Sequence, residues 1–222
     1  MRDTRATLER WNRDPWPVLR GWLAWSLLTA VALLAVVYVV ARGSTPDASR
    51  LLLPGVNGPV HVSDYGHLLL RNSLVLALHA MACVAGFIAG SSMPQLADER
   101  TGLSKKVHER AGTFAIGFVV CATTFSLATQ AYSLGQAAST LSAQFGITPA
   151  ALLLGILPHA VPELTALFLP LAAWVIASRR GDWDQLLAAT FATVALAVPV
   201  LLVSALVELY VSPALIIKLA GG

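Results

Sequence analysis

The stretch GWLAWSLLTAVALLAVVYVVA, residues 21–41, carries no charged side chain and decides the fold class. An α-helix rises about 1.5 Å per residue, so about 20 apolar residues cross the roughly 30 Å hydrocarbon core of a bilayer. Four further runs of this length each hold no more than one Asp, Glu, Lys or Arg. The sequence therefore predicts an all-α, polytopic transmembrane helix bundle of about five spans. The predicted spans are residues 21–41, 68–92, 111–132, 150–178 and 186–211.

Composition supports this class and excludes others. Hydrophobic residues make up 56% of the 222 positions and charged residues 12%, whereas about 25% of a soluble domain is charged. The net charge is only +3, and the basic residues form no stripe, which argues against nucleic acid as a partner. Cys83 and Cys121 lie in separate apolar runs, so we expect reduced packing residues. We predict no cofactor.

Two domains are expected from the distribution of charge. Residues 1–20 hold five arginines with Trp11 and Trp16, which suits either a short helix on an anionic membrane surface or a mobile tail. Residues 21–222 are predicted to form a single transmembrane helical domain.

The basic residues also predict the orientation. Eleven of the fifteen Lys and Arg fall before the first span, between the second and third, or after the fourth. The remaining four, Arg42, Arg50, Arg71 and Lys218, are left for the other side of the membrane. By the positive-inside rule we expect a multi-pass protein of the cell membrane with a cytoplasmic N-terminus, a cytoplasmic segment 93–110 and, with five spans, an external C-terminus.

Two segments leave alternatives open. The polar, uncharged stretch 133–148 either extends the third span or forms a re-entrant turn. The region 149–178 is longer than one perpendicular span requires, and it contains Pro158 and Pro162. Because proline removes a backbone donor, we expect a break in the fourth span near Pro158.

A few polar side chains lie inside the apolar runs, where each needs a partner and is a functional candidate by default. His159 and Glu163 are four residues apart, so they share a helical face. An interhelical clamp explains such a pair more simply than a proton or substrate site does, and two ligands without a His-Glu-x-x-His pattern predict no metal. The candidate intramembrane cluster is Asn72, His79, Gln130, His159, Glu163 and Glu208.

The phrase from Leu157 to Leu164, LPHAVPEL, resembles the Leu-Pro-His-Gly-x-x-Glu signature of the stage II sporulation protein M family. Two further segments are similar in order and spacing, one beginning at Arg71-Asn72-Ser73 and one running from Glu208 to Pro213. The resemblance covers about residues 68–215. The chain departs from the pattern at Ala160, where the family usually has Gly, and at Ser73, where a second Asn is common.

The resemblance implies a helical membrane protein whose founding member supports peptidoglycan remodelling by assembling with cell-wall hydrolases. Sporulation itself is not carried over, because most relatives occur in cells that never sporulate. We therefore expect a non-enzymatic scaffold that organises partner proteins in the lipid bilayer, either as a single copy or as a homo-oligomer. The alternative is a transporter or channel subunit with a polar path lined by His159, Glu163 and Glu208. An intramembrane hydrolase is disfavoured because no nucleophile stands at a recognisable spacing.

Overall fold

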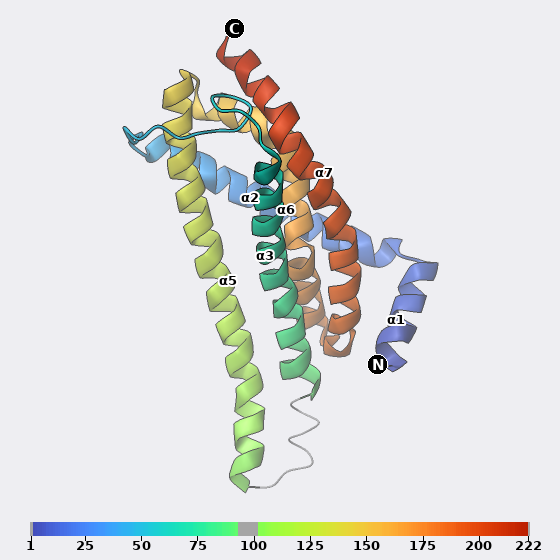
Figure 1. The fold of residues 1–222 in the computed structure, drawn as a ribbon. Coiled ribbons are helices and arrows are strands. Elements are labelled where there is room, and N and C mark those ends of the chain that lie inside the picture. The colour runs from blue at the N-terminus through green and yellow to red at the C-terminus, as the bar shows by residue number, and fades with distance from the viewer. Residues whose placement is uncertain (1, 93–101, 222) are drawn as a thin grey trace. The chain divides into compact units, whose positions relative to one another are not determined.

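The computed structural model describes residues 2–92 and 102–221, and nearly all of them are helical (Figure 1). No strand occurs in these residues; Pro54 and Gly58 form an isolated bridge. The α-helices are α1 (Arg2–Arg13), α2 (Trp16–Gly43), α3 (Val62–Phe87), α5 (Gly102–Phe145), α6 (Pro149–Arg180) and α7 (Leu186–Ala220). A π-helix, η1 (Ile88–Ser92), continues α3, and a 3-10 helix, η2 (Trp183–Gln185), precedes α7.

Four helical stretches in the described residues are long and apolar enough to cross a membrane. They are Trp16–Gly43, Val62–Ser91, Pro149–Arg180 and Trp183–Ala220. The all-α, polytopic transmembrane class is thereby confirmed. The remaining predicted span, 111–132, falls inside α5, where several side chains lie outside the described set. The count of five crossings stays a prediction.

The expected break near Pro158 is wrong, because α6 runs unbroken through both Pro158 and Pro162. A proline removes one backbone donor and leaves the carbonyl four residues earlier without its helical partner, which a packed helix can absorb. The stretch 133–148 resolves in favour of the longer helix, since α5 continues to Phe145. The segment 93–110 is helical from Gly102 onward, and residues 93–101 lie outside the described residues.

Within the part of the chain that the structure describes, the residues group into two compact units. The first unit comprises Met1–Ser26, Leu74–Phe125 and Leu167–Ala197. The second comprises Leu27–Ser73, Ser126–Ala166 and Val198–Gly222. Residues of both units come from each of five helices, namely α2, α3, α5, α6 and α7. Each unit has its own clusters of buried apolar residues.

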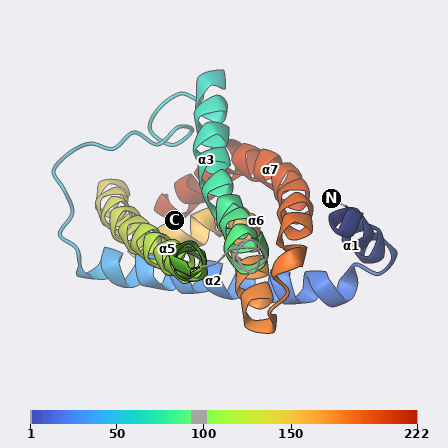
Figure 2. The same ribbon diagram turned by 90° about the horizontal axis from the view of Figure 1, so that it is seen from below.

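The N-terminal segment is a helix that packs on the first unit. Trp11 of α1 meets Trp22 of α2 edge to face, with the ring centroids 5.3 Å apart. Trp22 is buried with Leu169, Ala173 and Ala189, and Trp11 packs against this cluster. Figure 2 shows α1 beside the start of α7, in keeping with its contacts to η2. Of the two alternatives for residues 1–20, the structure has the helix.

A second cluster in the first unit joins α3 to α6. Cys83, which is fully buried, donates its thiol to the carbonyl oxygen of Pro170 at 3.0 Å. A Cβ on Gly86, one turn on, would lie 2.7 Å from Nε1 of Trp174. The absence of a side chain at residue 86 therefore lets the two helices approach closely.

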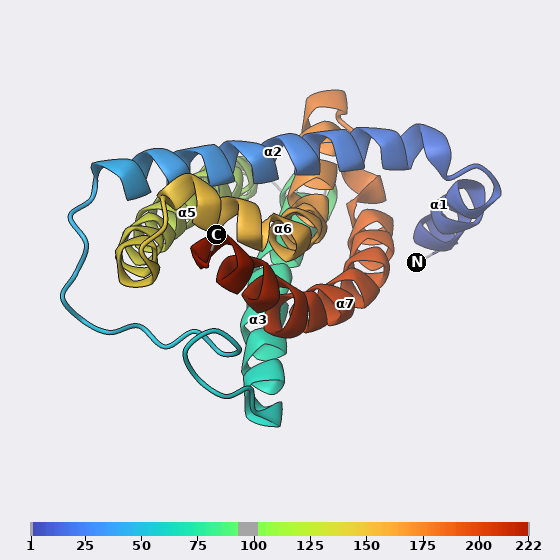
Figure 3. The same cartoon turned by 90° about the horizontal axis from the view of Figure 1, so that it is seen from above.

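In the second unit, the loop that follows α2 is bonded to α5 and packs against α7. The backbone N–H groups of Asp47 and Leu51 donate to Thr140 and Gln144 of α5, at 3.0 and 3.1 Å. Gly55, with φ of 80°, sits so close to α7 that a Cβ there would lie 2.9 Å from the ring of Pro213. In Figure 3 the loop leaves α2 and returns to α3, and the end of α7 lies beside the α5–α6 connection. That end is held in a core of Ala41, Ala138, Leu152 and Ile216.

Candidate functional site: an intramembrane polar cluster

The second unit gathers polar side chains from three apolar helices. We call them the polar cluster: Arg71 and Asn72 of α3, His159 and Glu163 of α6, and Glu208 and Ser212 of α7. On α6 and on α7 the two members are four residues apart, so each pair lies on one helical face. Polar groups inside a span are costly unless they find partners, which makes their convergence informative.

His159 and Ser212 are directly bonded across the α6–α7 interface. Nδ1 of His159 lies 2.6 Å from Oγ of Ser212, and both residues are buried. The imidazole and the hydroxyl can each donate or accept here, so the pair is satisfied in either tautomer. A short, buried bond between two spans fixes the register of one helix against the other.

Glu163 lies one turn from His159, near the side chains of Asn72, Glu208 and Arg71. The charges of Glu163 and Glu208 interact with one another and each with that of Arg71, yet none of the three forms an ion pair within the described residues. The amide of Asn72 lies beside the Glu163 carboxylate. Even so, Nδ2 of Asn72 and Oε2 of Glu163 are buried without a hydrogen bond of standard geometry. The cluster holds two carboxylates against one cation and has unused hydrogen-bonding capacity.

Two residues of the predicted set lie apart from these bonds. Gln130 donates through Nε2 to Oγ of Ser126 at 2.9 Å, a bond that stays within α5. His79 belongs to the first unit and is only 1% exposed. Its Nδ1 lies 2.8 Å from the carbonyl oxygen of Leu167, which can only accept, so Nδ1 carries the proton. Nε2 of His79 has no hydrogen-bond partner.

Arg71 and Ser212 are members of the polar cluster that the predicted set does not contain. Ser212 could have been predicted from the sequence, because it stands four residues after Glu208, the same spacing as that of His159 and Glu163. Arg71 reads in the sequence as a flanking charge, because it stands near the start of its apolar run. The structure places it ten positions inside α3, counting from Val62.

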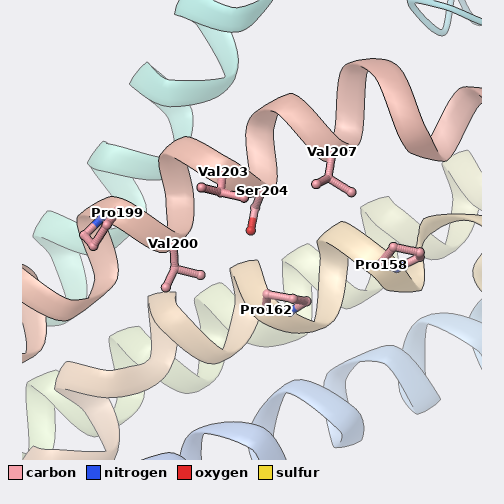
Figure 4. A pocket seen from close by; sticks show the side chains of 7 residues that line it. All are labelled: Pro158, Pro162, Pro199, Val200, Val203, Ser204 and Val207. Atoms are coloured by element: carbon pink, nitrogen blue, oxygen red, sulfur yellow. The ribbon is translucent and has the colours of Figure 1, made fainter.

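An apolar groove runs beside the polar cluster, between α6 and α7 (Figure 4). Its volume is about 380 Å³, and we call it the α6–α7 groove. Its lining is Pro158 and Pro162 of α6 with Pro199, Val200, Val203, Ser204 and Val207 of α7. Three of these, Pro158, Pro162 and Val207, immediately precede a member of the polar cluster. His159, Glu163 and Glu208 are therefore next in the sequence to residues that line the groove, about 100° around the helix from them.

The described residues hold no group of three or more His, Cys, Asp or Glu side chains that would suit a metal ion. What the polar cluster offers chemically is one closed pair, His159 with Ser212, and one open carboxylate, Glu163.

Together, the spans and the polar cluster define a polytopic helical membrane protein with an intramembrane polar site. The family model described as stage II sporulation protein M matches residues 110–213. This match covers just under half of the chain and supports the resemblance to the stage II sporulation protein M family. The matched range is shorter than residues 68–215, over which the sequence resembles the family. It includes His159, Glu163, Glu208 and Ser212 but not Arg71 or Asn72. No curated protein and no solved structure matches the chain.

Proposed function

We propose that the protein is a non-enzymatic membrane scaffold that holds a transmembrane helix of a partner protein in the α6–α7 groove. The observation that carries the proposal is Oε2 of Glu163, a buried carboxylate oxygen that forms no hydrogen bond of standard geometry and belongs to the residue next to Pro162 of the groove. A buried polar group without a partner costs about 1 to 3 kcal/mol, and more when charged. An occupant that supplies a donor would recover this free energy.

Charge favours a protein helix as the occupant over a lipid chain. The polar cluster has two carboxylates and one guanidinium, so its missing partner is a cation or a strong hydrogen-bond donor. An acyl chain supplies neither. A transmembrane helix with one Lys or Arg supplies both the apolar surface that fits valines and prolines and the charge that complements Glu163 and Glu208.

The lining of the groove also bears on the transporter alternative. A path for ions or polar solutes through a membrane needs polar groups along its wall. Ser204 is the one polar side chain among the residues that line the α6–α7 groove, and it is only 3% exposed. The geometry therefore favours the scaffold.

The setting of this scaffold follows from the family and from the basic residues. We place it in the cell membrane with its N-terminus in the cytoplasm, on the strength of the Lys and Arg distribution. The match to the family makes cell-wall remodelling factors the partners to test first.

A photo-crosslinking amino acid at Val203 tests the proposal in intact cells. Val203 lines the groove and is 60% exposed, whereas Leu206, on the same helix and 47% exposed, does not line it. We expect a discrete protein adduct at Val203 that is absent at Leu206. Its crosslinked peptide should come from a transmembrane segment with a Lys or Arg.

Replacing that Lys or Arg by Leu, or Glu163 by Gln in this chain, should weaken the adduct at least several-fold. Adducts with lipid alone, equal protein adducts at Leu206, or an adduct indifferent to both substitutions would each overturn the proposal.

A further inference from the structure

A second pocket, in the first unit, lies where several helices end. It is lined by residues of α1, the start of α2, the end of α6, η2 and the start of α7, and its volume is about 50 Å³. The side chains that matter here are Trp11, Trp22, Arg180, Asp182 and Gln185, all of which line it. We call it the interfacial pocket. No member of the polar cluster belongs to it.

The interfacial pocket contains two opposite charges that do not neutralise one another. Arg180 and Asp182 both line it, but neither forms an ion pair within the described residues. The neighbouring Arg179, by contrast, lies over the ring of Trp25, 5.2 Å from its centroid. A ligand that is itself a zwitterion would satisfy Arg180 and Asp182 together.

The turn after α6 fixes the position of Asp182. Gly181 has φ of 75°, and the N–H of Asp182 donates to the carbonyl oxygen of Ala177 at 3.0 Å. This six-to-one bond after a left-handed glycine is the Schellman ending of a helix. The Asp182 carboxylate is thus presented by a defined backbone rather than by a free loop.

Two aromatic side chains, Trp11 and Trp22, also line the interfacial pocket. The rings of Trp11 and Trp22 are nearly perpendicular, with an interplanar angle of 88°. The faces of indole rings attract cations, most strongly for Trp among the aromatic residues. Asp182, with Gln185 beside it, adds hydrogen-bond acceptors. The two tryptophan rings and Asp182 therefore suit an ammonium group, and Arg180 suits a phosphate.

Hydrogen bonding and depth narrow the ligand further. An unsubstituted ammonium can donate hydrogen bonds to the acceptors of Asp182 and Gln185, whereas a trimethylated one has no N–H to donate. Two membrane-crossing stretches, Trp16–Gly43 and Trp183–Ala220, begin beside the pocket, and Pro149–Arg180 ends there. Tryptophan at the ends of spans lies at headgroup level. These features place the interfacial pocket among lipid headgroups.

We propose that the interfacial pocket binds the phosphoethanolamine headgroup of a membrane phospholipid. The ammonium lies between Trp11, Trp22 and Asp182, and the phosphate lies on Arg180. This inference is independent of the proposed partner helix, since the two sites share no residue.

Lipid-dependent stability of the purified full-length protein tests the site. Detergent-solubilised protein is titrated with phosphatidylethanolamine, phosphatidylcholine or phosphatidylglycerol of the same acyl chains, and its Tm is measured. At 100 times Kd, phosphatidylethanolamine should raise Tm by roughly 5 to 10 °C, and the other two lipids should raise it much less. Native mass spectrometry should retain one phosphatidylethanolamine per chain.

Asp182→Asn and Arg180→Gln should each abolish the selectivity for phosphatidylethanolamine. Asp184→Asn, an exposed carboxylate two residues on, is the matched control and should keep it. All four proteins should share the same lipid-free Tm, since these side chains form no ion pair that the substitution breaks.

Three results would overturn the proposal. The first is equal stabilisation by phosphatidylcholine, and the second is full selectivity in Asp182→Asn. The third is the entire effect with soluble phosphoethanolamine, which would assign the pocket to a soluble ligand rather than to a lipid. Failure of the crosslinking experiment at Val203 would not produce any of these results.

Discussion

Nδ1 of His159 lies 2.6 Å from Oγ of Ser212, and this buried contact joins α6 to α7 within the second unit. The two residues are 53 positions apart in the sequence, so no local preference explains the contact. It stands one helical turn from the open carboxylate of Glu163. On one face of α6 the unit therefore has both a hydrogen-bonded residue, His159, and a carboxylate, Glu163, whose Oε2 has no hydrogen bond of standard geometry.

Ser212→Ala should lower stability by leaving the imidazole of His159 buried without its partner. We expect a loss of about 1 to 3 kcal/mol, which should lower the apparent Tm in detergent. Ser73→Ala, an exposed serine on α3, is the control and should change Tm little. A Ser212→Ala protein as stable as the wild type would show that the pair contributes nothing to holding α6 against α7.

Glu163→Leu should also destabilise the protein. The substitution removes the carboxylate that interacts with Arg71 and Asn72 and so leaves these two polar groups without it. The loss should be about 1 to 3 kcal/mol, measured as above. Glu99→Leu, in the charged stretch between the second and third predicted spans, should be nearly neutral by comparison. A Glu163→Leu variant more stable than the wild type would contradict the structural role of the polar cluster.

Gly86→Ala should destabilise the contact between α3 and α6. The added Cβ would lie 2.7 Å from Nε1 of Trp174 and 2.9 Å from Cδ1 of Leu186, which is closer than such atoms approach. Overpacking of this kind costs typically about 1 to 3 kcal/mol. Gly66→Ala, on the same helix with nothing within 4 Å of the added Cβ, should be neutral or stabilising by up to about 1 kcal/mol. If both variants behaved alike, the close approach at Gly86 would be refuted.

Reporter fusions should give opposite sides for the two ends of the chain. A reporter fused between Leu96 and Leu103 should report the cytoplasm, and one fused after Leu219 should report the exterior, because eleven basic residues lie on one side. Alkaline phosphatase and green fluorescent protein, which are active on opposite sides, provide the pair of measurements. A cytoplasmic C-terminus would require an even number of crossings and would exclude five.

The sequence by itself determined that this chain is a helical membrane protein. Runs without charge, such as residues 21–41, suffice for that conclusion, because helix length and the cost of burying charge in lipid are local properties. The same reasoning singled out His159 and Glu163, since a polar residue in an apolar run is visible without a structure. The phrase around Leu157 indicated a resemblance to the stage II sporulation protein M family, which the match over residues 110–213 supports.

Only the tertiary structure decided which polar groups meet. Ser212 bonds to His159 across the α6–α7 interface, and Arg71 of α3 lies near enough to Glu163 for their charges to interact. Such pairings depend on how each helix is rotated and shifted against its neighbours, which cannot be read from the sequence alone. Local rules failed for the same reason at Pro158. They predict a break, whereas packing against α7 and the rest of its unit offsets the lost hydrogen bond and keeps α6 continuous.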